Sequence, residues 1–170
     1  MYSYYHLLLF GLFILSIAIS YKQDRILSQT PYGGILSFEF KYGVNQIRTT
    51  VNDWDMRVYK SSNLKEYARR VIYFDFIFIL IYVTFLFSFN AVYSDRANLA
   101  MIATYLALAA GALDTVENSC MLQHIDGKIG IATIGMKLVA VYLKFVCFGI
   151  SVWILVSNWL RFGIRFDFVN

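Results

Sequence analysis

The sequence has little charge and almost no proline. Only 15% of its 170 residues are Asp, Glu, Lys or Arg, whereas soluble domains carry about 25%. One proline and the lack of any low-complexity stretch exclude a collagen-like repeat and a disordered chain. Apolar residues make up 59% of the chain and aromatic residues 18%. This composition is not that of a soluble domain, and we expect a single integral membrane domain spanning 1–170.

Motifs for catalysis, metal binding and nucleotide binding are also missing. Cys120 and Cys147 lie in apolar runs without CxxC or Cys/His spacing, so we expect small buried hydrophobic residues. There is no HExxH, P-loop, dinucleotide fingerprint or nucleophile elbow. His6 and His124 would lie at opposite faces of the membrane, which argues against a haem pair. We therefore expect no cofactor, no metal ion and, for want of a binding module, no nucleic-acid partner.

Four long apolar runs predict an all-α membrane fold. A first run that is retained as a helix is favoured over a cleaved signal peptide, because residues 1–6 hold no Lys or Arg. Short connections at 94–96 and 124–130 make successive spans antiparallel neighbours. We expect an antiparallel four-helix transmembrane bundle, since about 20 apolar residues cross a bilayer. The predicted spans are 4–21, 71–93, 97–122 and 131–160.

The distribution of basic residues predicts an orientation. Segment 22–70 holds nine of the 15 basic residues, and Lys128 lies on the same side of the membrane. Only Arg96, Arg161 and Arg165 lie on the other side. By the positive-inside rule, segment 22–70 is cytoplasmic and both termini lie outside, as in a bacterial inner membrane. The expected partner is the lipid bilayer, with other membrane-protein subunits or a second copy of the chain left open.

Segment 22–70 is also predicted to contain an amphipathic helix, from residue 37 to residue 60. Apolar residues recur there every three or four positions, with polar residues on the opposite face. Such a stripe with a tryptophan and a basic rim is typical of a helix in the membrane interface. Packing of the stripe onto the transmembrane helices is an equally open alternative. The stripe consists of Phe40, Val44, Ile47, Val51, Trp54 and Val58.

Charged residues occur inside the predicted spans, where each costs about 2.5–3.5 kcal/mol at the membrane centre. Asp114, Glu117 and Asn118 are three and four residues apart and share one helix face. We expect these side chains to converge in the cytoplasmic leaflet, with Glu117 paired to Lys137, and hydroxyls of Tyr105 and Tyr142 as further contributors. The candidate ligand- or proton-site residues are Asp75, Tyr82, Asp114, Glu117, Asn118, Lys137 and Lys144.

Two functions are compatible with such a cluster. Three acids against two lysines leave one carboxylate to hold a proton or a cation. In the first hypothesis the cluster is architectural, it sets the helix register, and the chain is a non-enzymatic accessory or binding protein. In the alternative, a cavity between the second, third and fourth spans handles a proton, an ion or a lipid-like ligand. That alternative includes a lipid- or sterol-type enzyme.

Several segments resemble an uncharacterised family of small bacterial four-span integral membrane proteins. The resemblance covers about residues 30–145 and rests on TPYGGILSFEF (30–40), Trp54, FDFIFILIY (74–82) and GALDTVEN (111–118). The LDTVEN element is its most specific part. The resemblance implies a four-span membrane fold and a bacterial membrane location, and implies no activity. The architecture is also similar to that of four-span sterol-isomerase-like membrane proteins, although no motif matches theirs residue by residue.

Overall fold

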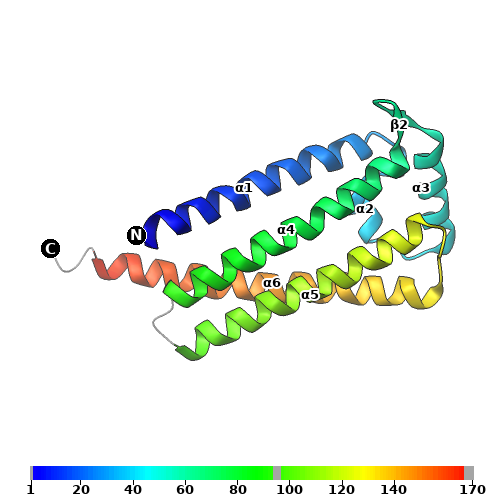
Figure 1. Cartoon of the computed structure of the whole chain (residues 1–170). Helices are drawn as coiled ribbons and strands as arrows, with labels where there is room; N and C mark the ends of the chain where they lie inside the picture. The colour runs from blue at the N-terminus through cyan, green and yellow to red at the C-terminus, as the bar shows by residue number, and fades with distance from the viewer. Residues whose placement is uncertain (1, 94–96, 167–170) are drawn as a thin grey trace.

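The chain is described here by a computed structural model that covers residues 2–93 and 97–166. Residues 1, 94–96 and 167–170, which include the predicted turn between the second and third spans, lie outside the described residues. Most of the described chain is helical (Figure 1). Within the described residues, four helices are long and apolar enough to cross a membrane. These are α1 (Tyr2–Leu27), α4 (Leu64–Tyr93), α5 (Ala97–Ile125) and α6 (Ile131–Phe166).

These four helices correspond to the predicted spans but are longer than the apolar runs. Helix α4 begins seven residues before the predicted start at 71. Its polar first turns continue the helix, and the side-chain oxygen of Asn63 accepts a hydrogen bond from the backbone N–H of Glu66 at 2.9 Å. Asn63 thereby caps the helix at a position that hydropathy does not reveal.

The long helices lie side by side, with α1 against α4, α4 against α5, and α5 against α6 (Figure 1). Aromatic rings line the contact between α1 and α4, where Phe13 and Phe85 stack with centroids 4.8 Å apart. The contact between α4 and α5 is close, because α5 turns Ala107 and Gly111 toward α4. A Cβ at Gly111 would lie 2.6 Å from a methyl group of Val83, so this approach requires glycine.

The segment that joins α1 to α4 contains two short helices and a hairpin: α2 (Ile35–Glu39), α3 (Val44–Met56), β1 (Val58–Tyr59) and β2 (Ser62–Asn63). The predicted single helix over 37–60 is therefore wrong. The chain is extended at Gly43, which separates α2 from α3. At the other end, Lys60 and Ser61 adopt positive φ angles of 45° and 68°, and the two-residue turn reverses the chain.

The apolar stripe of α3 packs against protein. Ile47 and Trp54 are fully buried, and the Trp54 ring lies 5.1 Å from the ring of Phe38. Val51 is buried in the same core, and Val44 packs at its edge. Val58 does not belong to the stripe, because it lies in β1 and is 75% exposed. The predicted contact of this stripe with the long helices is thus observed, with α4 and α5 as the neighbours.

Helix α2 is held inside the molecule by the turn that precedes it. Asp24 of α1 accepts a hydrogen bond from the backbone N–H of Leu36 at 3.1 Å and one from the Ser28 hydroxyl at 3.2 Å. A Cβ at Gly34 would lie 2.3 Å from the Asp24 carboxylate, so only glycine allows this approach. The turn thereby directs α2 back between α4 and α6 (Figure 1).

Candidate functional site

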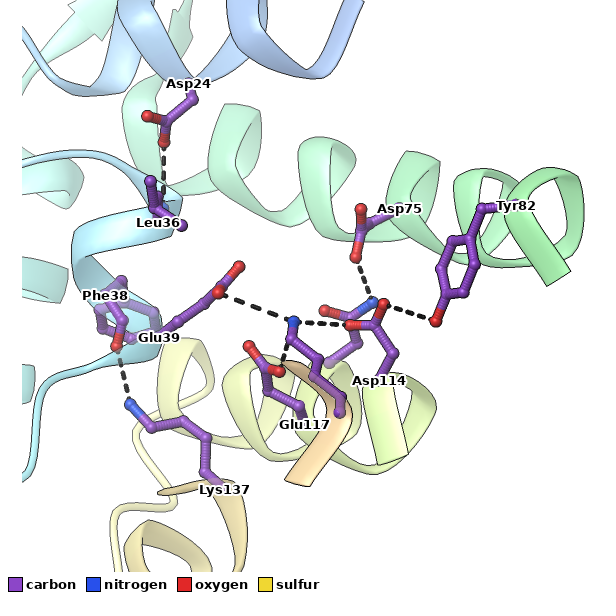
Figure 2. A network of polar contacts seen from close by, with 11 residues as sticks. Asp24, Leu36, Phe38, Glu39, Asp75, Tyr82, Asp114, Glu117 and Lys137 are labelled. Atoms are coloured by element: carbon purple, nitrogen blue, oxygen red, sulfur yellow. Dashed lines mark hydrogen bonds and ion pairs between the residues drawn. The ribbon is translucent and has the colours of Figure 1, made fainter. Parts of the chain in front are cut away.

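A buried lysine lies at the centre of the polar cluster. The Lys144 ammonium on α6 lies 2.6 Å from Glu117 and 2.8 Å from Asp114, both on α5, and 3.7 Å from Glu39 on α2. Figure 2 shows these three carboxylates converging on one ammonium group. Glu117 is fully buried, and the other three residues are less than 10% exposed. Lys144 therefore joins three helices through ion pairs that are shielded from water.

Two further contacts extend the cluster toward α4. The Tyr82 hydroxyl donates a hydrogen bond to the second oxygen of Asp114 at 3.2 Å. The Asn118 amide donates one to Asp75 at 2.8 Å. The close packing of α4 on α5 at Gly111 brings these side chains within reach. Six of the seven candidate residues thus lie together, with Tyr82 at the edge of the group. They are Asp75, Tyr82, Asp114, Glu117, Asn118 and Lys144.

Glu39 belongs to this cluster although the sequence did not single it out. It lies in the segment between the first two spans, and α2 brings it to Lys144. Burial raises the pKa of the Glu39 carboxyl well above its usual value, the nearby Lys144 ammonium opposes this shift, and the surrounding carboxylates add to it. The signal was present in ILSFEF (35–40), where one acid stands alone in an apolar run.

Lys137 makes a different contact from the predicted pair with Glu117. Its ammonium donates hydrogen bonds to the backbone carbonyls of Phe38 at 2.7 Å and Lys41 at 3.0 Å. It also lies 5.1 Å from the centre of the Phe38 ring. Among the described residues Glu117 is paired with Lys144, two helical turns further along α6. The physical reason is that the C-terminal end of α2 lies in front of Lys137, so that the carbonyls of Phe38 and of Lys41, just beyond the helix, point to its ammonium.

Other side chains considered from the sequence lie apart from the cluster. Tyr105 and Tyr142 are 64% and 61% exposed and contribute no hydroxyl to it. His124 is buried, and its Nε2 lies 3.0 Å from the Thr133 hydroxyl. Within the described residues, no three His, Cys, Asp or Glu side chains are grouped so that they could hold a metal ion.

The cluster borders a cavity of about 270 Å³. Glu39 and Asp75 reach from the cluster into its wall, and Asp24 lines it as well. The cavity was hypothesised between the second, third and fourth spans. The described cavity is lined instead by α1, α2 and α4, and of these only α4 is one of the three hypothesised spans. The remaining lining residues are Ile17, Ser20, Tyr21, Ile35, Leu36, Val71 and Phe78.

The cluster holds more acid than base. Asp75, Asp114, Glu117 and Glu39 are four carboxylates, and one ammonium, that of Lys144, lies among them. In the described part of the chain, the buried Oε1 of Glu117 has no hydrogen-bond partner, and the buried Oε2 of Glu39 has only the Lys144 ammonium, 3.7 Å away. Buried polar atoms are normally satisfied, so these oxygens are suited to bind a proton or a positively charged group.

The sequence matches no protein-family profile, no curated protein and no solved structure. The resemblance to four-span bacterial membrane proteins thus stays a prediction.

Proposed function

We propose that the chain is a small polytopic integral membrane protein, a non-enzymatic binding protein whose buried carboxylate cluster takes up positive charge as a proton or a cation. The four long apolar helices would form an antiparallel transmembrane bundle. The cluster would then lie in the leaflet nearest to α2 and α3. A bacterial inner membrane is the location that the resemblance implies.

One observation carries this proposal: three buried carboxylates share a single lysine ammonium, and a fourth carboxylate, that of Asp75, lies beside them. Even if Lys137 is counted, two negative charges stay uncompensated when all four acids are ionised. An uncompensated charge costs about 2.5–3.5 kcal/mol at the membrane centre, and burial in the protein likewise disfavours it. Binding of protons or cations removes that cost, so the cluster has a strong tendency to acquire positive charge.

The architectural hypothesis is a second candidate, and the three ion pairs of Lys144 favour it. They connect α2, α5 and α6, so the cluster also sets how these helices pack. The two functions differ in one measurable property. An architectural cluster has no need to exchange protons or cations with the solution.

Infrared difference spectroscopy on the purified protein in lipid nanodiscs tests the proposal. We expect the carbonyl band of a protonated carboxyl group at neutral pH, and its loss or reduction in Glu39→Gln or Glu117→Gln. Glu66→Gln is the matched control, because Glu66 is largely exposed and pairs with Arg69 at 3.5 Å. Equilibrium dialysis with radioactive Na⁺ tests the alternative counter-charge. Ionised carboxyls together with an absence of bound cation would overturn the proposal and leave the architectural role.

The orientation can be tested by cysteine labelling. After Cys120 and Cys147 are replaced by alanine, Met56→Cys and Asn170→Cys provide one reporter on each predicted side; Met56 is 78% exposed. From the excess of basic residues in segment 22–70, we expect membrane-impermeant thiol reagents to label Asn170→Cys in intact cells and to label Met56→Cys only after lysis. The reverse pattern would contradict the orientation.

A further inference from the structure

The cavity beside the cluster is a wedge between two helices. Its walls come from α1 and α4, and α2 closes one end. In Figure 2, Asp24, Glu39 and Asp75 approach this region from three different elements. Tyr21 and Leu36, at the rim, are 71% and 55% exposed, so the cavity opens at the outer side of the molecule, between α1 and α2. In a membrane this opening faces lipid near the cytoplasmic interface.

The charges that line the cavity select a cation. Its lining holds three carboxylates, those of Asp24, Glu39 and Asp75, and includes no Lys, Arg or His. Glu39 is nine-tenths buried, and its nearest cation among the described residues is the Lys144 ammonium at 3.7 Å, which Glu39 shares with Asp114 and Glu117. Asp75 uses one oxygen for the Asn118 amide. These carboxylates would repel an anionic ligand, whereas a cation would offset the negative charge that the single Lys144 ammonium leaves uncompensated.

The other walls select an apolar ligand body. Ile17, Val71 and Phe78 present aliphatic and aromatic surface along the length of the cavity. Aromatic faces also attract ammonium groups. A metal ion needs several oxygen ligands at short distances, and the described residues hold no such group. Apolar walls with a few polar groups at one end are typical of sites for small organic molecules.

We propose that this cavity binds an organic ammonium compound with an apolar body, which enters from the lipid side between α1 and α2. The ammonium group lies at Glu39 and Asp75, and the apolar body packs against Ile17, Val71 and Phe78. This inference rests on the proposed function, because the ligand supplies the positive charge that the cluster requires. Asp24 is occupied by the Leu36 amide and the Ser28 hydroxyl, and therefore shapes the cavity more than it binds.

Binding of 2-phenylethylamine tests the proposal, with 2-phenylethanol and 3-phenylpropanoate as neutral and anionic probes of the same shape. Isothermal titration calorimetry with the full chain in nanodiscs, corrected against empty nanodiscs, measures the affinity. We expect the amine to bind at least about tenfold more tightly than either analogue. Glu39→Gln and Asp75→Asn should each weaken amine binding by about tenfold or more, and Glu66→Gln should leave it unchanged.

Ser20→Phe tests the cavity without any change of charge. Ser20 lines the cavity from α1, so a phenylalanine there would fill it and should abolish amine binding. This variant and the neutral probe decide the question even if the acid variants do not fold. If the infrared carboxyl band is present but the amine does not bind, or binds Ser20→Phe equally well, the ligand class is wrong while the proposed function stands. If both the band and all cation binding are absent, both proposals fail.

Discussion

Lys144→Met should be the most destabilising single substitution in the cluster, with a loss of about 3–5 kcal/mol in the free energy of unfolding. The reason is that three buried carboxylates, those of Glu39, Asp114 and Glu117, share this ammonium. Its removal leaves them with mutual repulsion and without water to solvate them. Thermal or denaturant unfolding in detergent micelles measures the effect. Lys144→Arg, which retains the charge, should be milder.

A double-mutant cycle separates the ion pair from the packing of the side chain. Glu117→Gln combined with Lys144→Met should be less destabilising than the sum of the single variants, with a coupling energy of about 0.5–3 kcal/mol. Lys65→Met is the matched control, because Lys65 lies near the surface with Asp55 at 3.7 Å. A surface pair contributes about 0–1 kcal/mol. Equal effects of Lys144→Met and Lys65→Met would show that the buried cluster does not depend on its lysine.

Lys137→Met should have the second largest effect, about 2–4 kcal/mol, for a different reason. Lys137 is fully buried, and its ammonium satisfies the carbonyls of Phe38 and Lys41. Hydrogen bonds that involve a charged group contribute about 1.5–3 kcal/mol each. Methionine fills similar space but leaves the carbonyls of Phe38 in α2 and of Lys41 just after it without these bonds. We expect faster amide hydrogen exchange over 35–41, with α4 and α5 unaffected.

The pairing of Lys137 is tested by its coupling to Glu117. Glu117→Gln and Lys137→Met should be close to additive, whereas Glu117→Gln and Lys144→Met should not. Leu138→Met is a suitable control for side-chain flexibility at this point of α6, because Leu138 packs only at the edge of the neighbouring core. A coupling of Glu117 with Lys137 as large as that with Lys144 would contradict the contacts described here.

The long helices could be predicted because their determinants are local. Apolar runs of about 20 residues identify a helix that can cross a membrane, and they do so without reference to the rest of the chain. The helical period likewise placed Asp114, Glu117 and Asn118 on one face, and all three are buried in the structure. The ends of the helices were less accurate, because the polar first turns of α4 continue the helix beyond its apolar run.

The segment between α1 and α4 could not be predicted as well. The three- and four-residue period is present from Phe40 to Val58, yet the helix is interrupted at Gly43 and ends before Val58. The hairpin turn at Lys60 and Ser61 lacks the Asn-Gly or Asp-Gly signal that marks such turns. Periodicity alone does not say where a helix stops when the stop depends on the packing of the next element.

The sequence by itself determined the number of long apolar helices, the excess of acid over base within them, and the faces on which those acids lie. Only the tertiary structure decided that Lys144, and not Lys137, pairs with Glu117, and that Glu39 joins the cluster. Those contacts join residues that lie 27 to 105 positions apart in the sequence. They depend on α2, a helix of five residues too short to be stable alone. Its place between α4 and α6 is set by Asp24, Gly34 and Lys137, whose roles no local pattern reveals.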